Sequence, residues 1–438
     1  MTKILIAEDI PSHNKGEEAL FLGLVKSLQN LAPCEFKLLS VNPAHDAQNY
    51  AGMAEVVDAR GITPAHMIDS QASLPAKVFN ILLFFTRYFM FGIMFKLLGN
   101  NATKIMPNKV WKAFCEADLV LMAHDSFYAP RYHSCIALFC AALKKPVAIY
   151  AGTTQHKLFH TAPGEKEAAR KMLRFAMSKV PLILVREKFS YDNLMHLGLD
   201  PKKQQIEVHA DLAFIVDPSS PERASELMEK EEIPQDRPLV GMTMSLRQAQ
   251  HAFYDLPLEE RVKKSMKVLT EAIDHITGTL GANIVFIPHS VGPSRFLDDR
   301  ATADMIIENA AHKDRIFNMR TEYSVRDLKA LAGRLDMAVG ARLHFIVDAL
   351  CHNVPSILLT HKGEARCHGI VGQMVGLEKW VYNTDNISSE TLVPLIEELW
   401  KQRKEVKTYL EGKMPSIKDD VYNHGKRVKE LLEQKRKH

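Results

Sequence analysis

The chain has few cysteines and almost no excess of charge. Its 438 residues include six cysteines, and their spacing matches no disulfide framework. Reduced thiols in a cytosolic protein are the simplest interpretation. The 56 Lys+Arg against 52 Asp+Glu leave a formal net charge of +4, too small to argue for nucleic-acid binding. We therefore expect a cytoplasmic protein with no nucleic-acid partner.

Several common functional motifs are also missing. The sequence has no P-loop, no GxGxxG dinucleotide fingerprint and no nucleophile elbow. The apolar run at the start is too short for a signal peptide, and acids follow it at once. Five Cys and His residues look superficially like metal ligands but match no standard zinc spacing: Cys351, His352, His361, Cys367 and His368. We expect no metal and no bound cofactor.

One segment departs from the composition of a soluble domain. Residues 78–95 are dense in large apolar and aromatic side chains, and lysines flank them. A buried core helix, a membrane-spanning helix and a helix lying in the membrane interface are all compatible with a length of about 18 residues. Spanning would place Arg87 near the middle of the bilayer. The pattern favours an interfacial docking segment over residues 78–98, with basic residues at the lipid headgroups.

Strand and helix patterns alternate along the chain, which predicts an α/β protein with parallel sheets. Two proline clusters, at 218–221 and 234–238, divide the chain into two halves with a similar alternation of strands and helices. A short helix is expected between the two clusters. We expect two doubly wound, Rossmann-like domains facing a cleft in a GT-B-like arrangement. The N-terminal domain covers 1–217, the C-terminal domain covers 237–390, and helices at 391–438 cross back.

The first loop with candidate catalytic or binding residues follows the first strand. In Asn14-Lys15-Gly16-Glu17, the glycine lets the backbone turn tightly into a helix, whose N-terminus attracts anions. An asparagine N-cap followed by favourable first-turn acids explains the same residues structurally. Both interpretations stay open.

Further polar residues follow other strands, where ligands bind in open α/β sheets. The most informative stretch is Gly340-Ala341-Arg342-Leu343-His344, which places an arginine and a histidine one residue apart at the end of an apolar run. The other candidates at strand ends are Arg186, Arg247, His289 and Lys362. So many cations indicate an anionic substrate.

Taken together, these loops resemble the polysaccharide pyruvyl transferase family. The resemblance covers most of the chain up to about residue 381. It rests on Asn14-x-Gly16-Glu17-x-Ala19, Arg186-Glu187-x-x-Ser190, Gly340-x-Arg342-Leu343-His344 and Lys362. It implies a GT-B-like fold, phosphoenolpyruvate as donor, a sugar or lipid-linked oligosaccharide as acceptor, and a pyruvate ketal as product. It also implies roles for Arg186, His344 and Lys362.

The chemistry assigns a role to each candidate. Ketal formation needs a general acid, and histidine titrates in the right range, so His344 is the expected acid. Arg186, Lys362 and Arg342 are expected to hold carboxylate and phosphate. Glu17 or Asp125 is the candidate base for a sugar hydroxyl. The remaining predicted contacts to substrate are Asn14, Lys15, Gly16, Arg247 and His289.

Two other functions remain open at the level of sequence. A GT-B glycosyltransferase would use a similar positive site for a nucleotide sugar, with Glu364 as the ribose-binding carboxylate. A non-catalytic glycan-binding scaffold would keep the fold, although the intact cations and His344 argue against it. The sequence does not determine the acceptor sugar or the oligomeric state.

Overall fold

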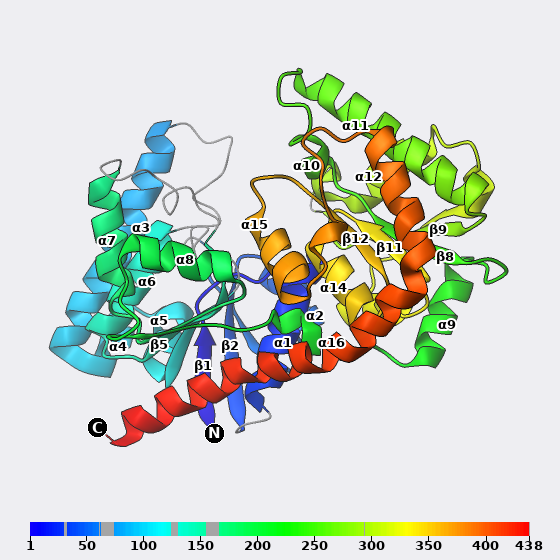
Figure 1. Cartoon of the computed structure of the whole chain (residues 1–438). Coiled ribbons are helices and arrows are strands. Elements are labelled where there is room, and N and C mark those ends of the chain that lie inside the picture. Colours follow the sequence, from blue (N-terminus) through cyan, green and yellow to red (C-terminus); the bar gives the residue numbers. More distant parts are fainter. Residues whose placement is uncertain are drawn as a thin grey trace. The chain divides into compact units, whose positions relative to one another are not determined.

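We analysed a computed structural model of the chain, which describes residues 1–29, 33–60, 62, 74–123, 130–154, 166–292 and 294–437. The chain forms two compact units (Figure 1). The first unit contains Met1–Ser12, Leu24–Asp211 and Asp420–His438, and the second contains His13–Gly23 and Leu212–Asp419. No sequence pattern indicated that the short segment His13–Gly23 would belong to the second unit.

The first unit is built on a seven-stranded parallel sheet of order β3-β2-β1-β4-β5-β6-β7. The central strands are apolar on both faces, as in β4, whose five residues are all buried, because helices cover both sides of such sheets. The strands are β1 Thr2–Ile6, β2 Cys34–Ser40, β3 Glu55–Asp58, β4 Leu119–Ala123, β5 Val147–Gly152, β6 Leu182–Val185 and β7 Gln205–Val208.

Helices connect these strands and carry the expected end signals. Asn108 caps one helix by accepting a hydrogen bond from the Val110 backbone N–H at 2.8 Å. Gly198 ends another in the left-handed conformation, with φ of +92°, as the sequence predicts. The helices are α1 Lys15–Gln29, which begins in the second unit, α2 Pro43–Asn49, α3 Leu74–Leu98, α4 Ala102–Ile105, α5 Lys109–Glu116, α6 Pro130–Ala142, α7 Glu167–Met177 and α8 Lys188–Leu197.

The second unit repeats the plan with a six-stranded parallel sheet of order β10-β9-β8-β11-β12-β13. Its strands are β8 Leu239–Thr243, β9 Asn283–Phe286, β10 Ile316–Asn318, β11 Met337–Gly340, β12 Ser356–Thr360 and β13 Val381–Asn383. Its helices are α9 Pro221–Lys230, α10 Leu246–Ala249, α11 Leu258–Asp274, α12 Asp299–Ile307, α13 Val325–Ala332, α14 Leu343–Cys351, α15 Ala365–Cys367 and the first part of α16 Ser389–Lys437.

Strand order reverses once in each sheet, between β1 and β4 and between β8 and β11. Such switch points are where doubly wound sheets bind ligands, outside the carboxyl ends of the strands. The predicted fold class, two Rossmann-like α/β domains, is confirmed. The short helix predicted between the two proline clusters is α9.

The apolar segment forms most of α3 and has two different faces. Phe84, Tyr88 and Phe91 are buried in an aromatic cluster, where the Phe91 ring stacks on Trp111 with centroids 4.8 Å apart. Large apolar side chains on the opposite face are exposed. Among the described residues, one helical stretch, Leu82–Ile105, is long and apolar enough to cross a membrane, with a mean hydropathy of 1.5. The inner face therefore behaves as a core helix, whereas the outer face keeps the features of an interfacial one.

The last part of α16 is anchored on β7 within the first unit. Asp420 accepts a hydrogen bond from the Ala210 backbone N–H at 2.7 Å, and its other oxygen lies 3.0 Å from His209 Nδ1. The His424 Nε2–H donates to the Ala210 carbonyl at 3.0 Å. Burial, with a smaller contribution from the adjacent His209, lowers the pKa of His424 to about 4.

This buried histidine predicts sensitivity to acid. A histidine whose pKa is lowered by folding contributes stability that is present above pH 6.5 and is lost as the pH falls toward 4. At pH 5 we expect a loss of about 2 kcal/mol, or roughly 4–8 °C in the melting temperature of the first unit. Thermal unfolding at pH 7.5 and 5.0 measures this drop.

The variant His424→Phe should be less stable at pH 7.5, because the Ala210 carbonyl loses its donor. Its melting temperature should fall less than that of wild type between pH 7.5 and 5.0. His196→Phe is the control, because His196 is exposed on α8 and its replacement should leave the drop unchanged. An equal drop in wild type and His424→Phe would contradict the assignment.

Candidate active site

The start of α1 is attached to the loop that follows β9, within the second unit. The Lys15 backbone N–H donates to the His289 carbonyl at 2.8 Å, and Asn14 forms a β-bridge with Ser290. Asn14 caps the helix, because its Oδ1 accepts a hydrogen bond from the Gly16 backbone N–H at 3.1 Å. The predicted Asn-Lys-Gly loop and His289 therefore lie together.

The first turn of α14 meets the first turn of α1. A Cβ placed on Gly16 would lie 2.3 Å from Nδ1 of His344, so only glycine allows this approach. Gly340 is required in the same way, since its Cβ would lie 2.6 Å from the Phe345 ring. Two helix N-termini, each with a partial positive charge, therefore converge beside the His344 imidazole.

Arg342, one residue before α14, is oriented by a buried carboxylate. Its Nη2 donates to Asp299 Oδ1 at 2.7 Å, and its Nε donates to the same oxygen at 3.1 Å. Asp299 Oδ2 accepts from the backbone N–H groups of His289 and Ser290 at 3.0 and 2.9 Å. One carboxylate thus holds both the arginine and the β9 loop on which α1 rests. No described side chain caps α14 at Arg342.

His289 is buried and connects to the interior of α14. Its Nε2 lies 3.2 Å from Asp348 Oδ2, and its ring packs edge-on against Phe345. Asp348 is one helical turn after His344 and also lies 3.6 Å from the ammonium of Lys329. The structure places His289 in this buried chain, which supports the helix that carries His344.

Lys15 is also buried and paired with carboxylates. Its ammonium lies 3.0 Å from Glu18 Oε2 and 2.8 Å from Glu322 Oε1. Burial raises the pKa of Glu18, whose other oxygen accepts from the Val325 backbone N–H at 3.0 Å. Glu17 is buried in the same helical turn.

Lys362 is exposed in the loop after β12, the strand next to β11. Its backbone N–H donates to Asp385 at 2.8 Å, which orders the loop. The neighbouring His361 ring stacks on His251 with centroids 4.0 Å apart. Glu364, in the same loop, pairs with Arg366 at 2.8 Å. Lys362 is thus an exposed cation at the same sheet edge as Arg342 and His344.

Arg186 belongs to the first unit and is fully buried. Its Nη1 donates to Asp211 at 2.8 Å. Glu187 is the N-cap of α8 and accepts from the Ser190 backbone N–H at 2.7 Å, and its burial raises its pKa. The Ser190 hydroxyl in turn accepts from the Thr154 backbone N–H at 2.8 Å. The Arg-Glu-x-x-Ser pattern therefore has a local structural role in addition to any role in binding.

Two predicted residues cannot be placed in the same detail. Asp125 lies outside the described residues, and Arg247 lies in α10 with only its backbone described. Sequence reasoning missed Asp299 and Asp348, and also a buried Glu8–His133 hydrogen bond in the first unit. Glu8 follows β1, so the strand-end rule could have found it.

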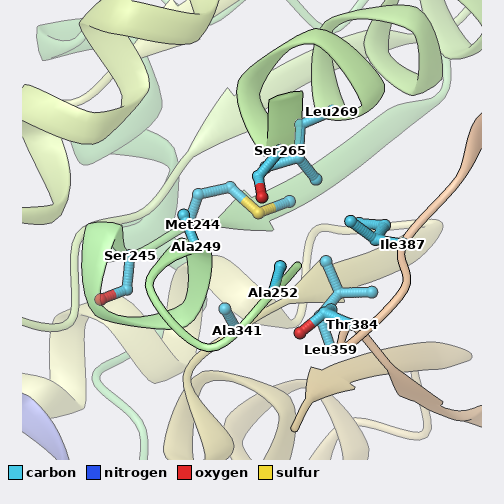
Figure 2. Close-up of a pocket in the computed structure, with 10 residues that line it drawn as sticks. All are labelled: Met244, Ser245, Ala249, Ala252, Ser265, Leu269, Ala341, Leu359, Thr384 and Ile387. Atoms are coloured by element: carbon cyan, nitrogen blue, oxygen red, sulfur yellow. The ribbon is translucent and has the colours of Figure 1, made fainter. Parts of the chain in front are cut away.

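A small, partly open pocket lies at the switch point of the second sheet (Figure 2). Met244 and Ser245 follow β8 and Ala341 follows β11, so the two strands on either side of the switch point both contribute. The lining is mainly apolar, and its side-chain hydroxyls belong to Ser245, Ser265 and Thr384 (Figure 2). The other lining residues are Ala249, Ala252, Leu269, Leu359 and Ile387.

The suspected metal ligands are poorly suited to that role. Burial raises the pKa of Cys367 to about 12 and also raises the pKa of Cys351. A thiol binds metal as the thiolate, which these shifts disfavour. Among the residues that the structure describes, no three His, Cys, Asp or Glu side chains are grouped to hold a metal ion.

The contact between Gly16 and His344 predicts a specific sensitivity. In Gly16→Ala the new methyl group would displace the imidazole, and we expect a loss of about 1–3 kcal/mol of stability. Gly412→Ala is the matched control, because Gly412 lies on α16 with open space around it. That replacement should add about 0.5–1 kcal/mol. Thermal unfolding compares both, and a wild-type melting temperature for Gly16→Ala would show that the contact is absent.

Comparison with solved structures supports the fold. A structure of Anabaena Alr3699/HepE in complex with UDP has a TM-score of 0.57 at 12% identity, covering 99% of this chain and 100% of that one. UDP-GlcNAc 2-epimerase from Neisseria meningitidis bound to UDP-GlcNAc, and Phytolacca americana UGT2 complexed with UDP-2fluoro-glucose and pterostilbene, have TM-scores of 0.56 and 0.55. Both share 12% identity, with 99% of this chain and 100% of theirs covered. These likenesses identify a GT-B-like fold.

The sequence comparisons identify the family. Comparison with curated proteins gives no match. The family model for polysaccharide pyruvyl transferase matches residues 14–363, a range that begins at the cap of α1 and includes Arg186, Arg342, His344 and Lys362. The resemblance noted from the loops is thereby confirmed, and the chain is a transferase that belongs to the polysaccharide pyruvyl transferase family.

Proposed function

We propose that this protein transfers pyruvate from phosphoenolpyruvate, as a ketal, to a sugar of a cell-surface polysaccharide or a lipid-linked glycan precursor. The observation that carries the proposal is the convergence of the α1 and α14 N-termini beside His344. Both elements fall within the range matched by the family model. Two helix N-termini, together with the exposed Lys362 after the neighbouring strand β12, suit a small, multiply charged anion.

His344 acts as the general acid in this proposal. It donates a proton to the methylene carbon of phosphoenolpyruvate, which becomes a methyl group and leaves the adjacent carbon electrophilic. A sugar hydroxyl attacks that carbon, and the C–O bond to phosphate breaks with its electrons on phosphate. A second hydroxyl of the same sugar then closes the ketal. Phosphate is the leaving group, and no redox step or cofactor is needed.

The other residues bind or position the reactants. Lys362 binds an anionic group of the donor, while Arg342, held by Asp299, sets the approach of the β11 loop. Glu17 is the candidate base for the sugar hydroxyl, because it lies in the helical turn of Gly16. Asn14 and the α1 backbone add hydrogen bonds. We keep anion binding as the proposed role of Arg186, whose guanidinium plane is already fixed by Asp211.

The acceptor and the site of action follow from the same reaction. A precursor of a surface glycan carried on a lipid is available at the inner face of the cell membrane. We propose that the protein works in the cytoplasm at that face.

A nucleotide-sugar glycosyltransferase is the second candidate function. The pocket at the β8–β11 switch point favours it, because the solved structures of similar fold include UDP complexes. In this alternative the pocket would widen to admit the nucleoside, and Glu364 would bind the ribose.

Ligand-induced stabilisation separates the two candidates. Phosphoenolpyruvate at 100 times its Kd should add about 2.7 kcal/mol to the stability of the folded protein, or roughly 5–10 °C in melting temperature. Lys362→Ala should reduce this shift, whereas Lys407→Ala, which removes an exposed lysine on α16, should not. A shift with UDP-sugars and none with phosphoenolpyruvate would establish the glycosyltransferase instead.

Replacement of the proposed acid should separate binding from chemistry. His344→Gln should keep the thermal shift with phosphoenolpyruvate but lower turnover by about 10²–10⁴-fold, the range that a general acid contributes. Turnover is measured as ¹⁴C from labelled phosphoenolpyruvate incorporated into a lipid-linked glycan fraction. Near-normal incorporation by His344→Gln would assign the proton transfer to another group.

A further inference from the structure

The outer face of α3 presents a continuous apolar stripe. Leu82, Phe89, Met90, Ile93 and Leu97 recur at helical spacing, so they project from one side of the helix. Their exposed fractions are 60%, 70%, 51%, 43% and 77%. Isolated exposed apolar residues are ordinary on protein surfaces, but a contiguous stripe with an aromatic side chain marks an interaction surface. We call these five residues the docking face.

The opposite side of α3 fixes this helix to the first unit. Tyr88 packs edge-on against Trp111 and Phe139, with centroids 4.9 and 5.0 Å apart, and Phe84 is buried beside it. The helix also packs against α6, which packs against α7 (Figure 1). A membrane-spanning position would pull these aromatic rings out of the core. The docking face can therefore contact a partner only while the inner face of α3 stays packed against the first unit.

The stretch of sequence that contains α3 carries charge of one sign. Residues 70–115 include six Lys and Arg and no Asp or Glu. The exposed lysines at and beyond the end of α3 are Lys96, Lys104, Lys109 and Lys112. Two of these lysines have an acid nearby. Lys112 lies 3.7 Å from Glu116 on α5, and Lys109 contributes, after Arg60, to the lowered pKa of Asp58. The apolar stripe thus continues into a basic border.

This combination identifies the kind of partner. A second copy of the chain would bring the same lysines to a two-fold interface and no negatively charged partner for them, because the same patch meets itself. A bilayer with anionic lipids offers both an apolar layer for Phe89 and Leu97 and negative headgroups for the lysines. We propose that the first unit docks on an anionic membrane surface through the docking face of α3, without crossing the bilayer.

The proposal rests on the docking face and the lysines that follow it, and not on the proposed reaction. A protein that fails to use phosphoenolpyruvate could still bind vesicles, and the reverse is also possible. Membrane binding and ligand-induced stabilisation therefore test two separate inferences.

The first experiment measures binding of the full chain to vesicles by cosedimentation. We expect binding to vesicles of 70% phosphatidylcholine and 30% phosphatidylglycerol, and at least tenfold weaker binding to phosphatidylcholine alone or at 1 M salt. The double variant Phe89→Asp/Ile93→Asp should bind at least tenfold more weakly to the anionic vesicles. Leu258→Asp is the matched control, since Leu258 is 52% exposed on α11 in the second unit.

A second measurement reports the depth of the helix. The wild-type chain has three tryptophans, so its emission is the reference. Relative to wild type, anionic vesicles should shift the emission of Phe89→Trp to shorter wavelength, and lipids brominated on their chains should quench the added emission. Lys96→Gln/Lys104→Gln should weaken binding several-fold while the fold is kept, as checked by circular dichroism.

Three results would overturn the proposal. One is the absence of wild-type binding to anionic vesicles. Another is equal binding of wild type and Phe89→Asp/Ile93→Asp at an unchanged melting temperature. The third is a wild-type dimer in light scattering that Phe89→Asp/Ile93→Asp converts to a monomer without any vesicle binding, which would assign the face to a second copy.

Discussion

The close approach of Gly16 to His344 is the constraint around which the second unit's site is arranged. A side chain at position 16 would occupy the place of the imidazole, so the two helix N-termini can converge only at a glycine. The approach also needs the first turn of α1 to be held in the second unit, and the hydrogen bond from Lys15 to the His289 carbonyl does this. The segment His13–Gly23, which follows the first strand of the first unit's sheet, therefore belongs to the second unit and forms part of its candidate site.

Carboxylates set the geometry of this cationic site. Asp299 holds Arg342 and the β9 loop together, and Asp348 connects His289 to α14 one turn below His344. Glu18 and Glu322 neutralise the buried ammonium of Lys15. Removing such charges from water is costly unless they are paired and hydrogen-bonded, which explains why each buried cation has an acid beside it. Among the side chains that the structure describes at this sheet edge, Lys362 is an exposed cation, and it is for that reason the better candidate for direct contact with a substrate anion.

The local parts of this arrangement could be predicted from sequence, and the long-range parts could not. Strands, helices, the Gly198 cap and the positions of His344 and Lys362 at strand ends follow from short patterns. The pairing of Arg186 with Asp211 and of Arg342 with Asp299 depends on how distant segments pack. From sequence alone, an acid next to the start of a helix is first interpreted as an N-cap. Lys15 and His289 were expected to face substrate because charge indicated a binding site, but the structure buries both. A charge in a sequence shows that a partner is needed, not whether the partner is a substrate or another side chain.

The helix α3 shows the same limit for apolar residues. Its sequence is apolar nearly all round, so hydropathy alone could not separate a core helix from an interfacial or spanning one. Aromatic contacts show that one face is a core face, because Tyr88 and Phe91 pack against Trp111 and Phe139. The other face keeps the excess hydrophobicity that the core does not use. Exposed Phe89 and Leu97 add nothing to folding in water, and the stretch 70–115 that contains them has six Lys and Arg and no Asp or Glu. This combination favours contact with the lipid of an anionic membrane.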